Sequence, residues 1–223
     1  MGPEATILLQ RKLLAAVPAR DDADHIPLLI DMNPQVPSRI AHLIERTGDD
    51  PAPVLAGMAA RLQAAGAQAL AMPCNTAHHY AGAIRAAVSI PFLDMVALSA
   101  DHARARLGSH GAVGLLASPA VRRTGLYDDA LHARGLAALW PDDDAPMLAA
   151  IREIKARGPG ARPQAALAAA TEALAARGAG LLLIACTEFS LLADRLTPVV
   201  PVIDTLDILV TEIVRHAKAG RRE

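Results

Sequence analysis

Short runs of consecutive apolar residues alternate along this chain with longer stretches in which apolar residues recur at helical spacing. The runs that we predict as strands are 26–31, 68–72, 91–94, 112–117, 137–140, 181–185 and 201–203. The stretches that we predict as helices lie near 5–17, 51–65, 76–88, 96–107, 122–134, 145–157, 162–177 and 206–218. Wholly apolar strands separated by helices are typical of parallel sheets that are covered on both faces. The pattern therefore predicts an α/β protein.

One part of this pattern occurs twice. Residues 65–74 read AGAQALAMPC and residues 177–186 read RGAGLLLIAC, so each copy ends in a cysteine eight positions after a glycine. The later stretches IPFLDM (90–95) and VPVIDT (200–205) also match. A duplication of this length predicts two similar Rossmann-like domains related by pseudo-twofold symmetry.

We place the first domain at residues 1–98 plus 207–223 and the second at residues 99–206. The count of predicted strands differs between them, since the second domain has four and the first has three. The first sheet is therefore expected to have one strand fewer than the second.

Composition excludes several classes of function. Hydrophobic residues make up 52% of the 223 residues and charged residues 20%, which is typical of a globular protein. A net charge of -1 with scattered basic residues, and only 2% aromatic residues, argues against nucleic acid or an anionic membrane as partner. No apolar run could span a bilayer and no signal peptide is visible, so we expect a cytoplasmic protein.

The two cysteines of the chain, Cys74 and Cys186, each follow a predicted strand and precede a helix. Ligands bind outside the carboxyl ends of parallel strands, and a helix N-terminus favours a thiolate. Polar neighbours that could cap these helices or orient a bound carboxylate are Asn75, Thr76, Thr187 and Glu188. Each cysteine therefore marks a candidate site.

Two symmetric domains would bring these thiols to opposite sides of an interdomain cleft. One thiolate could then remove a proton from a carbon atom while the other thiol returns a proton to the opposite face. This two-base chemistry racemises or epimerises its substrate without a cofactor, provided that the site stabilises the developing negative charge.

Other interpretations of the cysteines remain open. A lone cysteine near the end of a strand is often only a small buried hydrophobic residue. A metal site would combine Cys74 with His78 and His79, but no CxxC or HExxH pattern supports a metal, and we expect both histidines at the exposed start of a helix. A redox sensor would need the two thiols close enough to form a disulfide.

The motifs PCNTAH around Cys74 and ACTE around Cys186 resemble the two cysteine motifs of the aspartate/glutamate racemase superfamily, closest to its aspartate racemase branch. Further similar stretches are MGPEAT (1–6), HIPLLIDMNPQVPSR (25–39), TGLY (124–127), EIKARG (153–158) and VPVID (200–204). The resemblance implies two domains with four-stranded parallel sheets, a small amino-acid substrate, no cofactor and a homodimer. It also implies a strand before the MGPEAT motif, at which this chain begins, so the first sheet is expected to lack its N-terminal strand. We expect either that the true start lies upstream of Met1 or that the chain is a truncated product with weakened function.

The resemblance also implies roles for individual residues. Cys74 and Cys186 would be the acid/base pair, and Arg39 and Lys155 would be cationic contacts of the substrate. An arginine suits a dicarboxylate because it can clamp a carboxylate with two hydrogen bonds. For Arg39 or Lys155 alone, the alternative is a solvated surface charge. The remaining predicted substrate contacts are Asn75, Thr76, Ser118, Thr187 and Glu188.

The sequence departs from the family pattern in the loop after the first strand of the second domain. Where the family carries a threonine, this chain has Val121, and we expect Ser118 and Thr124 to compensate. The leading prediction is therefore a racemase of aspartate, and possibly also of glutamate. The alternatives are a non-catalytic or weakened dicarboxylate-binding descendant and a related single-thiol isomerase.

Overall fold

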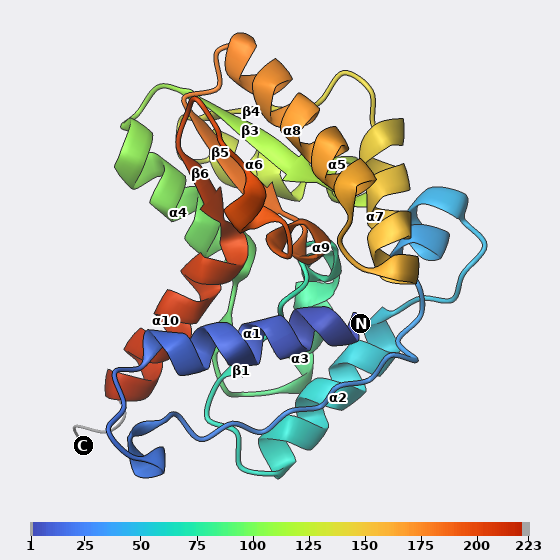
Figure 1. Ribbon diagram of the computed structural model, residues 1–223. Coiled ribbons are helices and arrows are strands. Elements are labelled where there is room, and N and C mark those ends of the chain that lie inside the picture. Colours follow the sequence, from blue (N-terminus) through green and yellow to red (C-terminus); the bar gives the residue numbers. More distant parts are fainter. Residues whose placement is uncertain (1, 220–223) are drawn as a thin grey trace. The chain divides into compact units, whose positions relative to one another are not determined.

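The computed structural model describes residues 2–219 and divides the chain into two compact units (Figure 1). Unit 1 comprises Met1–Met95 with Leu206–Glu223, and unit 2 comprises Val96–Thr205. Within the described residues, no helix is both long enough and apolar enough to cross a membrane.

Unit 2 is built on a four-stranded parallel sheet with strand order β4-β3-β5-β6. Its strands are β3 (Ala112–Ala117), β4 (Ala137–Leu139), β5 (Leu181–Ala185) and β6 (Val202–Asp204). Its helices are α4 (Met95–Leu107), α5 (Pro119–Thr124), α6 (Leu126–His132), α7 (Ala145–Arg157), α8 (Ala161–Ala176), α9 (Thr187–Ser190) and the 3-10 turn η4 (Ala193–Arg195).

The central strands of unit 2 are buried because helices cover both faces of the sheet. Every residue of β5 is buried, and so are five of the six residues of β3. On one face, Val113 and Leu183 pack in a cluster with α4, α5 and α6. On the other face, Leu116 and Leu182 pack in a cluster with α7, α8 and α9. The continuous apolar runs of these strands follow directly from this two-sided burial.

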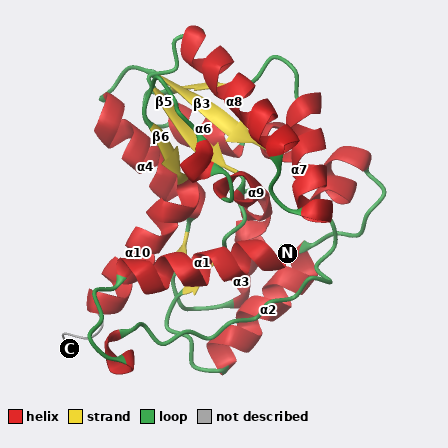
Figure 2. Ribbon diagram, viewed as in Figure 1, coloured by secondary structure: helices red, strands yellow, loops and turns green. Residues whose placement is uncertain are grey.

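Unit 1 has a much smaller sheet, as the yellow strands in Figure 2 show. Among the described residues of this unit, only β1 (Leu70–Ala71) and β2 (Phe92–Leu93) pair, in parallel. The helices are α1 (Pro3–Ala16), α2 (Ala52–Ala64), α3 (Ala81–Ala87) and α10 (Thr205–Ala219), with the 3-10 turns η1 (Asp22–Asp24) and η3 (Thr76–Tyr80) and the π-helix η2 (Ala41–Glu45). The core of this unit gathers around Leu55, Met58, Leu70, Met72 and Ile84.

Several predicted elements differ from the structure. Residues 26–31 form no strand: they run as an extended loop because nothing pairs with them in the described part of the chain. The first sheet therefore has two strands in the described residues, where three were predicted for this chain. The predicted helix 122–134 is two helices, because Gly125 adopts a left-handed conformation with φ of 67°. The predicted helix 76–88 begins as the 3-10 turn η3.

The duplicated sequence folds into the same local structure in both units. After α2, Ala67 N–H donates to Leu62 O at 3.0 Å; after α8, Ala179 N–H donates to Leu174 O at 3.1 Å. The glycine between helix and strand has a positive φ in both copies, 98° at Gly66 and 90° at Gly178. Both helices thus end in the same glycine-dependent turn.

Strand register is repeated as well. Leu70 N–H donates to Pro91 O at 2.8 Å, and Leu182 N–H donates to Pro201 O at 2.9 Å. Leu70 pairs with Phe92 in the first sheet, as Leu182 pairs with Val202 in the second. The β1–β2 pair is therefore the structural counterpart of the β5–β6 pair.

Candidate functional site

Cys74 follows β1 and is partly exposed. Its N–H donates to Met72 O at 2.8 Å, which turns the chain out of the strand. Asn75 is buried, and the turn η3 begins at Thr76. The predicted contacts Asn75 and Thr76 therefore directly follow Cys74 in the sequence, after the carboxyl end of β1.

His78 supports this loop and is buried, so the expectation that it would be exposed is wrong, whereas His79 is exposed. The Nε2 of His78 accepts a hydrogen bond from Met95 N–H at 3.1 Å, and the Nδ1 of His78 lies 2.8 Å from Cys74 O. Because Nε2 accepts, Nδ1 carries the proton and donates it to Cys74 O. Burial lowers the pKa of His78 and keeps the ring neutral.

The geometry of His78 bears on the metal interpretation. Both ring nitrogens already have backbone partners, so neither has a lone pair to offer to an ion. Within the described residues, no group of three His, Cys, Asp or Glu side chains is arranged to hold a metal. The role of His78 is therefore to tie the loop after β1 to the start of α4.

Tyr80 is a candidate residue that the sequence analysis missed. Its side chain is buried and its hydroxyl has no hydrogen-bond partner within residues 2–219. Burial raises the pKa of Tyr80 to about 12; the charges of Asp50 and Cys74 also raise this pKa, while Arg39 opposes them. These influences place the phenol within electrostatic range of both Cys74 and Arg39. The feature of the sequence that could have identified Tyr80 is its position six residues after Cys74, in a chain with only two tyrosines.

Arg39 is half-buried, and its own loop holds it in place. Its Nη1 donates to Pro37 O at 2.9 Å and to Val36 O at 3.3 Å. An arginine pinned by main-chain carbonyls keeps its other guanidinium donors oriented, which reduces the entropy lost when a carboxylate binds. In unit 1 the predicted residues Cys74 and Arg39 thus both influence the same tyrosine electrostatically.

Cys186 occupies the corresponding position in unit 2, at the N-cap of the short helix α9, and it is buried. Its thiol donates to Glu188 Oε2 at 3.1 Å. Burial raises the pKa of Cys186 well above its ordinary value, and the negative charge of Glu188 raises it further. The expectation that a helix N-terminus would favour a thiolate is therefore wrong for Cys186, because burial and the neighbouring carboxylate outweigh a helix of four residues.

Lys155, on α7, completes a chain of contacts in unit 2. Its Nζ lies 3.4 Å from Glu188 Oε1, so the carboxylate bridges the lysine and the thiol. The structure therefore joins three predicted residues, Cys186, Glu188 and Lys155, in one polar cluster. Thr187 lies between Cys186 and Glu188 in the sequence, and it is buried.

Ser118 lies near Cys186 at the carboxyl edge of the sheet. The preceding residues, Ala117 and Ala185, are paired neighbours in β3 and β5. The Oγ of Ser118 accepts from Val121 N–H at 3.3 Å, so this hydroxyl caps α5. Thr124 Oγ1 donates to Val121 O at 2.6 Å, and the side chain of Val121 is buried in the core. The hydroxyls of Ser118 and Thr124, which were expected to replace the threonine hydroxyl absent at Val121, are thus both hydrogen-bonded to local backbone groups.

Comparisons with known proteins agree on one family. The sequence model described as Asp/Glu/Hydantoin racemase matches residues 1–213. Among solved structures, an aspartate racemase from Picrophilus torridus is 24% identical with a TM-score of 0.80, and the match covers 97% of this chain and 90% of that one. A glutamate racemase from Bacillus anthracis is 18% identical with a TM-score of 0.69, covering 97% and 79%. At these identities the structural matches establish the fold.

Proposed function

Because the chain belongs to the Asp/Glu/Hydantoin racemase family, we propose that it is a cofactor-independent racemase that interconverts L- and D-aspartate, and possibly the enantiomers of glutamate. The observation that carries this proposal is the repeated strand–cysteine structure. Cys74 and Cys186 each follow a strand that comes after the same kind of turn, and the two strands pair with their neighbours in the same register. Two equivalent thiols are what a two-base mechanism requires.

In the proposed reaction, one cysteine thiolate takes the α-proton of the amino acid, and the electron pair of the C–H bond passes to the α-carbon and its carboxylate. The other cysteine gives its thiol proton to the opposite face of that carbon. No atom is gained or lost, and the two cysteines exchange protonation states in each turnover. Because burial and Glu188 raise the pKa of Cys186, Cys186 is proposed as the proton donor and Cys74 as the base at the start of the turnover.

The proposal gives a role to each predicted substrate contact. Arg39 would bind the side-chain carboxylate through guanidinium donors that its loop leaves available. Asn75, Thr76, Ser118 and Thr187 would hold the α-carboxylate and ammonium groups. Glu188 would stabilise the Cys186 proton, and Lys155 would balance the charge of Glu188 and attract the substrate.

The test is chiral analysis of aspartate incubated with the intact chain and with Cys74→Ser and Cys186→Ser. We expect D-aspartate from L-aspartate with the intact chain, and loss of nearly all racemisation in each variant, because a serine hydroxyl is a far weaker acid than a thiol. In heavy water, two-base chemistry places deuterium in the product and little in the remaining substrate. Full activity in either variant would rule out the pair of thiols as the acid/base pair.

A second candidate is a non-catalytic protein that binds a dicarboxylate, favoured by the two-stranded first sheet and by Val121. It predicts saturable binding of L-aspartate by calorimetry without formation of D-aspartate. A single-thiol isomerase would instead retain activity on its substrate in one of the two serine variants. We also propose a homodimeric, cytoplasmic enzyme, and sedimentation of the purified chain tests its oligomeric state.

A further inference from the structure

The fourth residue after each cysteine has a polar side chain that is buried. It is His78 after Cys74 and Ser190 after Cys186, and these residues are 3% and 7% exposed. Buried polar side chains are nearly always hydrogen-bonded, so their partners show what each of them holds in place.

In unit 1, the side chain of His78 joins the loop after β1 to the residue at which α4 begins. Its ring donates to Cys74 O at 2.8 Å and accepts from Met95 N–H at 3.1 Å. Met95 stands two residues after the end of β2, the strand that pairs with β1. One side chain thus ties the carbonyl of the cysteine to the carboxyl end of the paired strand.

In unit 2, Ser190 makes the same two connections with different atoms. Its N–H donates to Cys186 O at 3.3 Å, and its Oγ donates to Asp204 Oδ1 at 2.9 Å. Asp204 is buried and is the last residue of β6, the strand that pairs with β5. In both units, therefore, the fourth residue after the cysteine links the carbonyl of that cysteine to the end of the paired strand.

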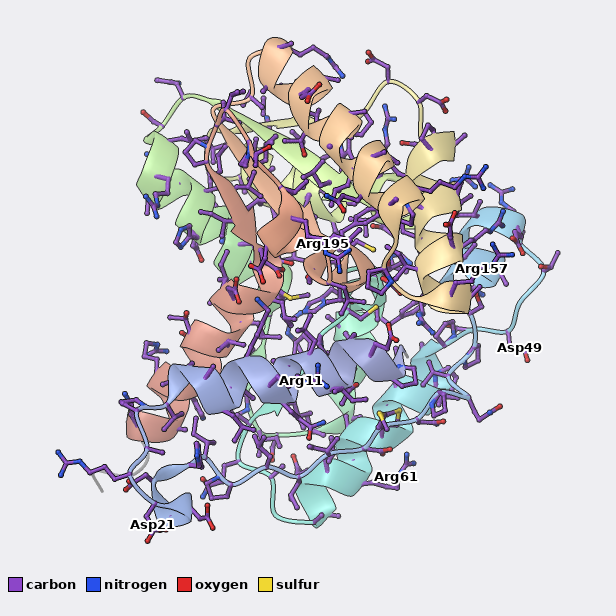
Figure 3. All side chains as sticks on the ribbon, in the orientation of Figure 1. Arg11, Asp21, Asp49, Arg61, Arg157 and Arg195 are labelled. Carbon is purple, nitrogen blue, oxygen red and sulfur yellow. The ribbon has the colours of Figure 1, made fainter. Side chains whose placement is uncertain are left out.

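The bond between Ser190 and Asp204 also closes a long loop. From Ser190 the chain runs through η4, on which Figure 3 labels Arg195, and past Val199, which is 83% exposed, before it enters β6. The helix α9 ahead of this loop has four residues, too few to keep a fixed direction by its own hydrogen bonds. The bond from its last residue to the sheet supplies that direction.

Asp204 is a firm anchor for this bond because the sheet fixes its place. Asp204 pairs with Ile184 of β5, and Thr205 Oγ1 donates to Ile184 O at 2.9 Å. Ile184 stands two residues before Cys186. The strand that leads to Cys186 and the helix that follows it are therefore joined through Asp204.

We propose that Ser190 and Asp204 are positioning residues for Cys186, and that His78 is the corresponding positioning residue for Cys74; this inference rests on the proposed function. Glu188 contacts the thiol of Cys186 itself, whereas Ser190 and Asp204 act through the backbone of that cysteine. A displacement of about 1 Å can cost about hundredfold in rate, so a bond that touches no substrate still governs the reaction.

The test compares Ser190→Ala with His78→Leu in heavy water, because the two variants release different thiols. In Ser190→Ala we expect the kcat of racemisation to fall about hundredfold while KM changes less than about threefold. Cys74 still removes the α-proton of one enantiomer, a solvent deuteron replaces that proton on its sulfur, and the deuteron is returned to the same face of the carbon. Deuterium therefore enters this enantiomer without inversion. In His78→Leu, such exchange should be confined to the other enantiomer.

Thr171→Val is the matched control for lower stability. Like Ser190, Thr171 is a buried residue of unit 2, and its hydroxyl donates to Leu167 O at 2.8 Å within α8. Loss of this hydroxyl should leave racemisation and exchange as they are in the intact chain. Asp204→Asn keeps an oxygen that can accept from Ser190, so it should retain most of the kcat.

A second measurement needs no activity. Iodoacetamide should alkylate Cys186 about fivefold or more faster in Ser190→Ala than in the intact chain, with no change at Cys74, because the released helix exposes the thiol. In His78→Leu only the labelling of Cys74 should become faster. If the intact chain does not racemise aspartate while these selective changes appear, the proposed function fails and the positioning of the thiols stands.

Several results would overturn the inference. Full kcat in Ser190→Ala would do so, as would an equal fall of kcat in Thr171→Val. Exchange of the same enantiomer in Ser190→Ala and His78→Leu, or of neither, would mean that the two residues do not act on separate thiols. If Ser190→Ala does not fold, as judged by the fluorescence of Trp140, Asp204→Ser removes the bond from its other side and replaces it in each comparison. Unfolding of both variants would assign the bond to the fold alone.

Discussion

The two strand–cysteine copies of this molecule share their turns and their register but differ in what surrounds them. β5 is bonded on both sides and buried throughout, whereas β1 is bonded on one side and borders a groove. Cys186 is buried beside a carboxylate, while Cys74 is partly exposed beside a neutral histidine and a tyrosine. Similar local sequences thus form the same helix–turn–strand unit in both copies, but the number of strands that pair with that unit differs: β5 has two neighbours and β1 has one among the described residues.

The same comparison separates the two thiols chemically. Equivalent backbone positions place both cysteines where a ligand could meet the ends of the strands. Their side-chain neighbours differ, so their proton affinities need not match. A two-base racemase needs one base and one acid at the start of each turnover, and the environment of Cys186 favours the acid.

The largest expected difference concerns the matched leucines of the two strands. Leu182→Ala should lower the free energy of unfolding of unit 2 by about 3 kcal/mol, because Leu182 is fully buried between β5 and the helices. Leu70→Ala should cost unit 1 only about 1 kcal/mol, since Leu70 already borders an open groove. Native-state hydrogen exchange in each unit measures both changes. Equal costs would mean that the groove does not loosen the packing around β1.

The next largest difference is expected between the contributions of Arg39 and Lys155 to aspartate binding. Arg39→Met should weaken aspartate binding by about 2 kcal/mol, or roughly thirtyfold, if its guanidinium binds a carboxylate. Lys155→Met should have a smaller effect, because Glu188 already shares the charge of Lys155. Isothermal calorimetry of both variants gives the affinities. An unchanged affinity in Arg39→Met would make Arg39 an ordinary surface charge.

The thiols should also differ in reactivity. Iodoacetamide at pH 8 should alkylate Cys74 about tenfold or more faster than Cys186, because alkylation needs an accessible thiolate and burial with Glu188 keeps Cys186 protonated. Glu188→Gln removes one cause of the raised pKa and should speed the labelling of Cys186 alone. Peptide mass spectrometry resolves the two sites. Equal rates in the intact chain would contradict the assignment of Cys186 as the resting acid.

Acid should destabilise unit 1 through His78. The pKa of this histidine is lowered in the folded state, so its neutral form stabilises the fold above the unfolded pKa of about 6.5, and this contribution is lost as the pH falls below that value. Between pH 7.5 and 5.5 the loss should be about 1 kcal/mol. Hydrogen exchange around η3 should show it, and His78→Gln should remove the dependence. A pH dependence that persists in this variant would place the titrating group elsewhere.

The smallest effect compares the two helix N-caps. Ser118→Gly gives α5 the cap residue that α1 has at Gly2, and it should cost a few tenths of a kcal/mol, whereas Ser118→Ala should cost about 1 kcal/mol. Urea unfolding followed through the single tryptophan, Trp140 in unit 2, measures both. A larger cost for glycine than for alanine would show that the hydroxyl is not the main contribution of this residue.

Much of the fold could be predicted from sequence where burial is two-sided. The strands β3 and β5 have the predicted bounds, because each is a continuous apolar run enclosed by helices on both faces. Residues 26–31 have the same kind of sequence but form no strand, because strand formation depends on a partner that a local pattern cannot supply. The break at Gly125 was missed because a helical pattern can continue across a left-handed residue.

The candidate site was predictable only in part. The cysteines could be located because both are rare and both fall at the same point of a repeat. The protonation of Cys186 could not, since it depends on the burial of the thiol and on how Glu188 folds back towards it. Tyr80 was missed and the burial of His78 was mispredicted, because both follow from packing beside the loop of Cys74, which their positions in the sequence do not reveal.

The most direct test of the central claim is proton NMR of L-aspartate in heavy water with the purified chain. The account predicts that the α-proton signal decays, that D-aspartate accumulates with deuterium at the α-carbon, and that Cys74→Ser and Cys186→Ser each abolish the accumulation. An intact α-proton signal at saturating L-aspartate, in a protein that calorimetry shows to bind it, would contradict a two-thiol racemase.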